Sequence, residues 1–201
     1  MKGLFVTGTD TGVGKTFVSC ALIRASRLAG HQVFAFKPIE TGCPAGGYGE
    51  DQHALAAAAG DVPRGTYCLR QPAAPWVAAQ SEGAEIDLAR IAGDLTASRS
   101  FDRVLVEAAG GWRVPVTREA DTSDLARLCQ LPVLVVARAG LGTINHTLLT
   151  VEAIQRDGLE LAGVVLSLRP EDDADFATSN AAQIRIRSGV PVHCLPTLPS
   201  L

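Results

Sequence analysis

The sequence has few aromatic residues and no long apolar run. Only 5% of its 201 residues are Phe, Trp or Tyr. Its longest apolar runs, such as Leu131 to Ala137, fall well short of the roughly 20 residues that a membrane-spanning helix needs. The run that starts at Leu4 is too short for the apolar core of a signal peptide. These absences predict a soluble, cytoplasmic protein with no membrane partner.

The sequence also lacks an excess of charge of one sign. It has 18 Lys and Arg residues against 21 Asp and Glu residues, a formal net charge of −3. This balance excludes a generally basic surface of the kind that binds nucleic acid, although a local basic pocket is compatible with it. A chain of 201 residues is close to one domain of roughly 150 residues, and folding hides about 70% of its surface. We therefore predict a single domain over residues 1–201.

No pair of cysteines has the C-x-x-C spacing. The cysteines are scattered, at Cys20, Cys43, Cys68, Cys129 and Cys194. An odd, scattered set is neither a disulfide framework nor a zinc site, and it suits a reducing compartment. We expect these thiols to be small, buried apolar side chains.

Short apolar runs alternate with longer helical patterns along the chain. Near-continuous apolar runs are typical of strands covered on both faces, as in a parallel sheet between layers of helices. The expected strands are residues 4–6, 33–36, 104–106, 133–136, 162–166 and 192–195, and the expected helices are residues 15–29, 51–59, 86–98, 122–129, 144–157 and 173–188. Glycines at positions 30, 60, 158 and 189 suit the left-handed position after a helix. Residues 41–49 are predicted as a flexible loop and residues 64–76 as a proline-rich irregular segment. The alternation predicts a doubly wound α/β fold.

A glycine-rich loop follows the first predicted strand. Its sequence from Gly8 to Thr16 is GTDTGVGKT, and a helix is expected directly after it. Backbone N–H groups in such a loop bind phosphate oxygens, the lysine reaches the β- and γ-phosphates, and the hydroxyl binds Mg²⁺. The strict spacing would place a glycine at position 9, where this chain has Thr9. The flanking strand and helix favour a nucleoside triphosphate site over a chance glycine-rich turn.

Charged residues follow other predicted strands. Glu107 ends one predicted strand and precedes small residues, and Asp51 follows the predicted flexible loop at residues 41–49. Mg²⁺ typically takes one or two carboxylates besides phosphate oxygens. Asp51 is equally compatible with a helix N-cap. Lys37 ends the strand at residue 36, beside the strand of the phosphate loop, and two lysines suit the charge of a phosphoryl-transfer transition state. A solvated strand-end lysine is the alternative.

A further glycine-containing segment, from Gly140 to His146, follows a strand and opens a helix. Free N–H groups at a helix start favour a carboxylate or a phosphate. A capping turn made by Thr143 or Asn145 is equally compatible with the residues.

The combination of these strings resembles the dethiobiotin synthetase family. The strings are GTDTGVGKT at 8–16, KPIETG at 37–42, VEAAGGW at 106–112 and LGTINH at 141–146. The resemblance implies a single-domain, P-loop NTPase-like α/β fold, with a mostly parallel central sheet and helices on both faces. It also implies ATP- and CO2-dependent closure of a cyclic urea on 7,8-diaminononanoate in biotin biosynthesis. Mg²⁺ is the implied cofactor, and a homodimer with its active site at the interface is the implied assembly.

The resemblance assigns roles to individual residues. The implied catalytic residues are Thr11, Lys15 and Lys37. The implied nucleotide-binding residues are Gly12, Val13, Gly14, Lys15, Thr16, Phe17, Glu107, Ala108, Ala109, Gly110 and Ser167. The implied substrate-binding residues are Thr11, Lys37, Thr41, Gly142, Thr143 and Asn145. The implied metal ligands are Thr16, Asp51 and Glu107, with Glu50 left open as the alternative to Asp51.

The chain departs from the family pattern at a few positions. Ala108 stands where the family usually has glycine, and a positive φ there would cost alanine about 1 kcal/mol or more, so we expect an ordinary backbone conformation. Ser167 stands near the position of a base-reading Asn, and a hydroxyl cannot present the paired donor and acceptor of an amide, which leaves the base preference open. The segment after Leu195 is short and is expected to lie near the base.

Other function classes share parts of this pattern. A partitioning ATPase of the same superfamily carries an extra lysine early in its loop, where this chain has Asp10. A glutamine-dependent amidating synthetase needs a glutaminase region for which the chain has no room. A degenerate nucleotide-binding module is disfavoured by the intact Lys15, Lys37 and Glu107.

Overall fold

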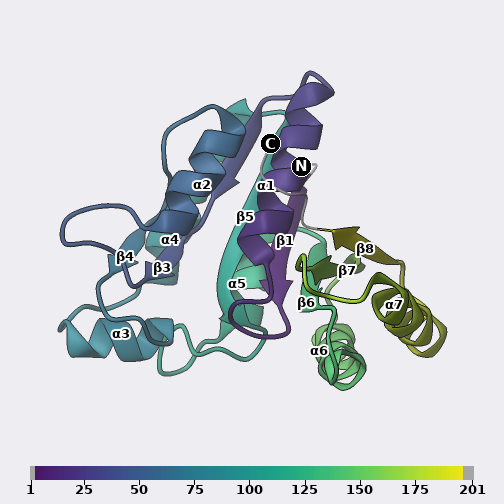
Figure 1. Ribbon diagram of the computed structural model, residues 1–201. Coiled ribbons are helices and arrows are strands. Elements are labelled where there is room, and N and C mark those ends of the chain that lie inside the picture. Colours follow the sequence, from purple (N-terminus) through teal and green to yellow (C-terminus); the bar gives the residue numbers. More distant parts are fainter. Residues whose placement is uncertain (1–2, 197–201) are drawn as a thin grey trace.

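The computed structural model describes residues 3–196 and has a six-stranded parallel sheet at its centre (Figure 1). The strands are β1 (Gly3–Gly8), β2 (Val33–Phe36), β5 (Arg103–Gly111), β6 (Val133–Arg138), β7 (Leu161–Leu168) and β8 (Val192–Pro196). Their order across the sheet is β2-β5-β1-β6-β7-β8, and every neighbouring pair is parallel. The predicted α/β class is confirmed.

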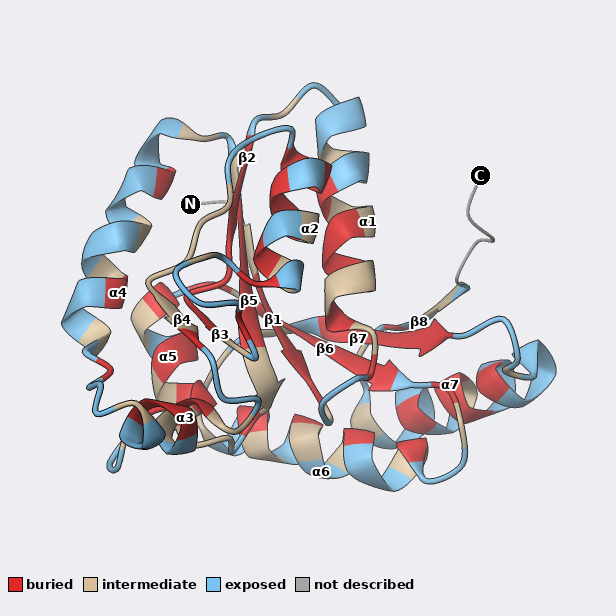
Figure 2. Cartoon of the chain, turned by 60° about the vertical axis from the view of Figure 1, so that its left-hand side comes forward, coloured by how far each residue is buried: buried red, intermediate tan, exposed pale blue. Residues whose placement is uncertain are grey.

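Helices cover both faces of this sheet, as predicted. They are α1 (Lys15–Leu28), α2 (Glu50–Ala59), α3 (Pro75–Ser81), α4 (Leu88–Leu95), α5 (Thr122–Cys129), α6 (Thr143–Arg156) and α7 (Ala174–Ser188), with a 3-10 turn η1 (Thr96–Ser100) after α4. One apolar cluster joins α1 and α2 to the sheet, and a larger one joins α3 to α7 to the opposite face. Figure 2 shows α1 and α2 on one side of the sheet and α6 and α7 on the other. Because successive strand residues pack into opposite layers, each strand reads as a continuous apolar run.

A second, two-stranded parallel sheet lies beside the first. It pairs β3 (Ile39–Thr41) with β4 (Tyr67–Leu69). The sequence analysis predicted neither β3 nor β4, since it placed residue 41 in a loop and residues 64–76 in an irregular segment, and it predicted no helix where α3 lies. A strand of three residues is too short to show a period in the sequence. This sheet brings β3 to the edge of the cavity described below.

Most predicted element boundaries agree with the structure to within a few residues. The helix predicted over 86–98 instead begins at Leu88, because the side chain of Asp87 accepts a hydrogen bond from Ala89 N and caps it. The glycines predicted after helices have φ values of 86° at Gly30, 63° at Gly60, 73° at Gly158 and 70° at Gly189. The left-handed conformation expected for these glycines is confirmed.

The cysteines are all free thiols, as expected. Cys20, Cys43 and Cys129 are buried, whereas Cys68 and Cys194 are half-buried. The prediction that the cysteines are buried is therefore confirmed for Cys20, Cys43 and Cys129 but not for Cys68 and Cys194.

The position of β2 corrects one prediction about Lys37. The sequence analysis places its strand next to β1, but β2 pairs with β5, which lies between β2 and β1. The strand β5, with Glu107 in its middle, therefore lies between β1 and the strand that precedes Lys37. Within residues 3–196, none of the helices is both long enough and apolar enough to cross a membrane.

Candidate active site

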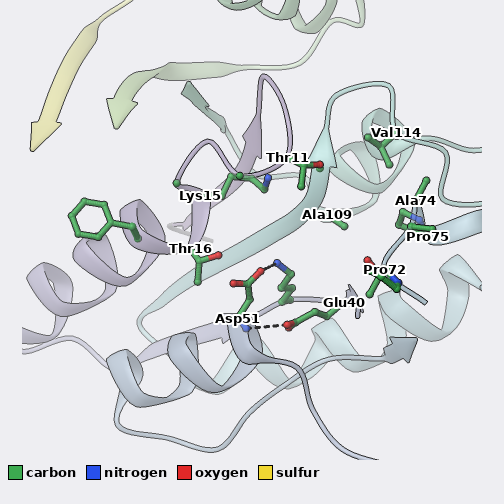
Figure 3. A pocket seen from close by; sticks show the side chains of 17 residues that line it. Thr11, Lys15, Thr16, Glu40, Asp51, Pro72, Ala74, Pro75, Ala109 and Val114 are labelled. Atoms are coloured by element: carbon green, nitrogen blue, oxygen red, sulfur yellow. Dashed lines mark hydrogen bonds and ion pairs between the residues drawn. The ribbon is translucent and has the colours of Figure 1, made fainter. Parts of the chain in front are cut away.

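A cavity of about 610 Å³ opens at the carboxyl ends of β1 and β5 (Figure 3). Ligands of open α/β sheets bind at this edge. The predicted site residues that line it are Thr11, Gly12, Gly14, Lys15, Thr16, Phe17, Lys37, Thr41, Asp51, Ala109 and Gly110. Most of the predicted residues are thus brought together around one space.

The phosphate loop folds back over the end of β1. A Cβ on Gly8 would lie 2.7 Å from Asp10 O and 2.9 Å from a methyl group of Val13, which explains why glycine stands at position 8. The helix α1 begins at Lys15 after Gly14, and no side chain within the described residues caps its N-terminus. Its first N–H groups are therefore available to an anion. The side chain of Val13 packs in the core, so only its backbone can contact a ligand.

Lys15 lies inside this loop. Its Nζ donates to Asp10 O at 3.3 Å, and the side chain is buried. Burial lowers the pKa of Lys15, and the nearby carboxylate of Glu107 opposes this effect. Thr11 lies at the edge of the cavity (Figure 3) and its N–H bonds to the Asp10 carboxylate at 2.7 Å.

Lys37 joins two carboxylates at the cavity floor. Its Nζ lies 2.9 Å from Glu107 Oε1 and is also ion-paired with Asp51 Oδ2. Burial opposes the charge on Lys37, but the two carboxylates outweigh it and raise the pKa of Lys37 above its usual range. Burial likewise acts to raise the pKa of Asp51, but the charge and hydrogen bond of Lys37 outweigh it and lower that pKa. The lysine is 4% exposed, so the alternative of a solvated strand-end lysine is wrong.

Glu107 is fully buried and has one unsatisfied oxygen. Its Oε1 accepts hydrogen bonds from the Thr16 hydroxyl at 2.9 Å and from Lys37. Its Oε2 is buried with no hydrogen-bond partner among the residues that the structure describes. Such an orphaned acceptor is costly in a low-dielectric interior unless a cation or donor satisfies it.

The structure also decides between the alternatives for Asp51. The helix α2 begins at Glu50 after Gly49, so Asp51 lies within the first turn and is not its N-cap. Asp51 is ion-paired with Lys37, whose charge and hydrogen bond lower the pKa of Asp51. Glu50 is exposed to solvent. Asp51 thus faces Lys37 and Glu50 does not, and the choice of Asp51 as a metal ligand stays a prediction.

The strand β5 continues past Glu107 to Gly111, so the prediction that Glu107 ends its strand is wrong, but Ala108 has an ordinary backbone conformation. Among residues 3–196, the only residue other than glycine with a positive φ is Gln130, so the expectation for Ala108 is confirmed. The side chain of Ala108 packs in the core, and Ala109 and Gly110 line the cavity.

The remaining predicted residues lie outside this cavity. Ser167 is buried near the end of β7, with its Oγ 2.4 Å from where a Cβ on Gly14 would stand. The helix α6 starts at Thr143 after Gly142, without a side-chain cap from any described residue, so a capping turn by Thr143 or Asn145 is wrong. The Thr143 hydroxyl is buried against Thr147, and Asn145 is exposed. Residues 197–201, the end of the segment expected near the base, lie outside the described residues.

Several cavity residues were missed by the sequence analysis. Pro72, Ala74, Pro75 and Val114 form an apolar wall, and Glu40 lies on the floor beside Asp51 (Figure 3). The paired prolines were read only as a mark of irregular structure. Glu40 stands inside the KPIETG string, between residues that were noted.

Comparisons with known proteins agree on one family. The family described as "AAA domain" matches residues 2–201. The ATP-dependent dethiobiotin synthetase BioD of Anaeromyxobacter dehalogenans (strain 2CP-C) is 47% identical, over 100% of this chain and 92% of the relative. The protein of the same name from Aromatoleum aromaticum is 43% identical, over 95% of this chain and 88% of the relative. The protein of the same name from Cellvibrio japonicus is 39% identical, over 100% of this chain and 90% of the relative.

Proposed function

The chain belongs to the family of ATP-dependent dethiobiotin synthetases, and from this premise we propose that the cavity converts 7,8-diaminononanoate, CO2 and ATP into dethiobiotin, ADP and phosphate. Membership makes the chain an ATP-using ligase of biotin biosynthesis. The observation that carries the proposal is the buried Lys37, held by Glu107 and Asp51 beside a phosphate loop.

The reaction divides into three bond-forming steps. The lone pair of one neutral amine attacks the carbon of CO2, and the amine loses a proton to give a carbamate. A carbamate oxygen attacks the γ-phosphorus of ATP, and ADP leaves. The second amine attacks the carbonyl carbon of this mixed anhydride and loses a proton, and phosphate leaves as the ureido ring closes.

The chain's own contribution is positioning and charge balance. Lys15 and the N–H groups at the start of α1 bind the phosphates, and Lys37 stabilises the negative charge that develops between the carbamate and the γ-phosphate. Thr11 and Thr41 lie at the same cavity and bind the carbamate or the diamine. The wall of Pro72, Pro75 and Val114 suits the apolar chain of the diamine and excludes water beside it.

The residues present fit a magnesium ion. A hydroxyl and two carboxylates from Thr16, Asp51 and Glu107 are hard oxygen donors, and Glu107 Oε2 is buried without a partner in the described part of the chain. Over that part, no group of three or more His, Cys, Asp or Glu side chains could hold a metal by itself. This suits Mg²⁺, which uses few protein ligands together with phosphate oxygens. Mg²⁺ bound there would neutralise charge on the phosphates.

A second copy of the chain completes the substrate site in this proposal. Gly142, Thr143 and Asn145 are absent from the lining of their own cavity. An uncapped helix start attracts a carboxylate, and the diamine carries one at its far end. Leu141, beside this helix start, is 84% exposed, and Leu149 within α6 is 57% exposed, which suits an interface between copies. We place the enzyme in the cytoplasm, because it uses ATP and has free thiols.

The decisive experiment measures phosphate release by the purified protein with MgATP and bicarbonate. Release that depends on added diaminononanoate supports the proposal. Release that the diamine does not change would favour a partitioning ATPase, and bound nucleotide without any release would favour a degenerate binding module.

A further inference from the structure

The helix that carries Asp51 starts without a cap of its own. Its N-cap is Gly49, which has no side chain to accept hydrogen bonds from the first turn. The first N–H groups of a helix need acceptors, and a Ser, Thr, Asp or Asn at the N-cap commonly supplies one. Such a side chain would accept hydrogen bonds from the N–H groups of Asp51 and Gln52.

Glu40, on β3, supplies these acceptors from another part of the chain. Its Oε1 accepts from Asp51 N at 2.9 Å, and its Oε2 accepts from Gln52 N at 2.8 Å. A Cβ on Gly49 would lie 2.0 Å from Glu40 Oε1 and 2.2 Å from its Cδ. The Glu40 carboxylate therefore occupies the space of an N-cap side chain. Figure 3 shows it pointing at the backbone of Asp51.

Gln52 ties the same turn to the chain beside Lys37. Its Oε1 accepts from Gly49 N at 3.0 Å, and its Nε2 donates to Lys37 O at 3.0 Å. The side chain is 1% exposed, and a Cβ on Gly65 would lie 1.9 Å from its Nε2, so glycine at 65 makes room for it. The start of α2 is thus fixed to the segment from Lys37 to Glu40 by several hydrogen bonds.

We propose that Glu40 is a positioning residue that caps α2 from a neighbouring strand and so holds Asp51 against Lys37 and Thr16. The proposal rests on the role proposed above for Asp51 as a metal ligand. Both Glu40 oxygens are engaged by backbone donors, so Glu40 acts on the reaction through Asp51. Glu40 lies three residues after Lys37, on β3, so the strand that caps α2 also follows the lysine that Asp51 faces.

The test compares Glu40→Ala with the double variant Glu40→Ala/Gly49→Asp. Gly49 has φ −81° and ψ 174°, an extended conformation that suits an N-cap aspartate, and removing the Glu40 side chain frees the space for it. We expect Glu40→Ala to speed amide hydrogen exchange at Asp51 and Gln52. It should also weaken Mn²⁺ binding in the presence of a non-hydrolysable ATP analogue. The expected loss is about fivefold to tenfold, because it corresponds to the free energy that a helix cap contributes. The double variant should restore most of the protection from amide exchange and most of the Mn²⁺ affinity.

A matched control removes a similar carboxylate elsewhere. Glu82 Oε1 accepts from the backbone N–H groups of Arg70 and Gln71, which follow β4 and lie outside α2. Glu82→Ala should leave Mn²⁺ binding and exchange at Asp51 unchanged. Gly49→Asp alone should impair both, because its side chain collides with Glu40.

Each outcome decides a separate point. Unchanged exchange at Asp51 and Gln52 in Glu40→Ala overturns the cap. Faster exchange with unchanged Mn²⁺ affinity overturns the positioning role and leaves a structural one. If Glu40→Ala does not fold, Glu40→Gln keeps the volume and one acceptor, and it should give a smaller change in the same direction. Hydrogen exchange does not depend on turnover, so a failure of the proposed reaction is seen separately, as absence of diamine-dependent phosphate release.

Discussion

At the scale of single residues, the site depends on charges that are paired inside the protein. Lys37 is buried between Glu107 and Asp51; the two carboxylates raise the pKa of Lys37, and Lys37 in turn lowers the pKa of Asp51. Removing one member of a buried pair leaves an uncompensated charge, which costs about 3 to 5 kcal/mol. Substitutions here therefore change both the reaction and the stability of the fold.

Lys37→Ala is expected to lower the turnover rate by about 10² to 10³-fold, because it removes a preorganised donor from the developing negative charge. It should also lower the free energy of unfolding by about 3 kcal/mol, since Glu107 loses its cation. Single-turnover phosphate release, corrected for the folded fraction from circular dichroism, measures the first effect, and urea unfolding measures the second. Near-normal turnover by the folded variant would remove Lys37 from the mechanism.

Ala108→Gly restores the residue that is usual in the family, yet we expect it to bring no gain. Ala108 is buried in a strand with ordinary backbone angles, so glycine adds only backbone entropy to the unfolded state and removes a packed methyl group. The free energy of unfolding should fall by about 1 kcal/mol. Turnover should stay the same. A faster enzyme with unchanged thermal stability would contradict this interpretation.

At the scale of elements, the loop after β5 is fixed to the end of α6 through Asp157. Trp112 Nε1 donates to Asp157 Oδ2 at 2.7 Å, and Arg113 Nη2 donates to Asp157 Oδ1 at 2.9 Å. A carboxylate at a helix C-terminus is unfavourable to the helix dipole. Its place there is explained by these two partners, which connect the strand that carries Glu107 to the helix layer.

This connection predicts a pH-dependent stability. Burial acts to raise the pKa of Asp157, but the hydrogen bonds from Arg113 and Trp112 outweigh it and lower that pKa below its usual value of 3.8. The folded carboxylate therefore stabilises the protein above pH 3.8, and this contribution is lost as the pH falls through the lower folded-state pKa. Asp157→Asn should lower the free energy of unfolding by about 2 kcal/mol at neutral pH.

Urea titrations of the wild type and of Asp157→Asn across the acid range measure this difference. The difference in unfolding free energy between the two proteins should become smaller as the pH falls, because the wild-type carboxyl becomes protonated and resembles the amide. A constant gap at all pH values would show that the charge of Asp157 contributes nothing.

The elements also show what the sequence alone could and could not predict. The inner strands of the main sheet were recognisable because both their faces are covered, which leaves continuous apolar runs such as that of β6, whereas the edge strand β8 is only partly buried. The strands β3 and β4 have three residues each and carry no measurable period. Lys15 was found from its loop and Lys37 from its place after a strand, whereas Glu107 was found although β5 continues beyond it to Gly111. Glu40 was not found, because its role depends on the N–H groups of a helix that starts ten residues later.

At the scale of the whole molecule, the proposed site extends beyond one chain. The cavity has a phosphate loop, a charged floor and an apolar wall, whereas the predicted carboxylate-binding residues of α6 lie outside it. Leu141 is 84% exposed, and a contact between copies would remove this apolar area from water. A second copy would cover it and would complete the site in the same contact.

Leu141→Asp tests this coupling between assembly and substrate binding. A charge in the contact should shift the protein from dimer to monomer and raise the KM for the diamine at least tenfold, while the affinity for ATP changes little. Ile186→Asp is the matched control, because Ile186 on α7 is 76% exposed and lies outside the proposed contact. Sedimentation velocity measures the oligomeric state and the KM measures diamine binding, each at two enzyme concentrations. A monomeric Leu141→Asp variant with the wild-type KM would mean that one chain binds the whole diamine by itself.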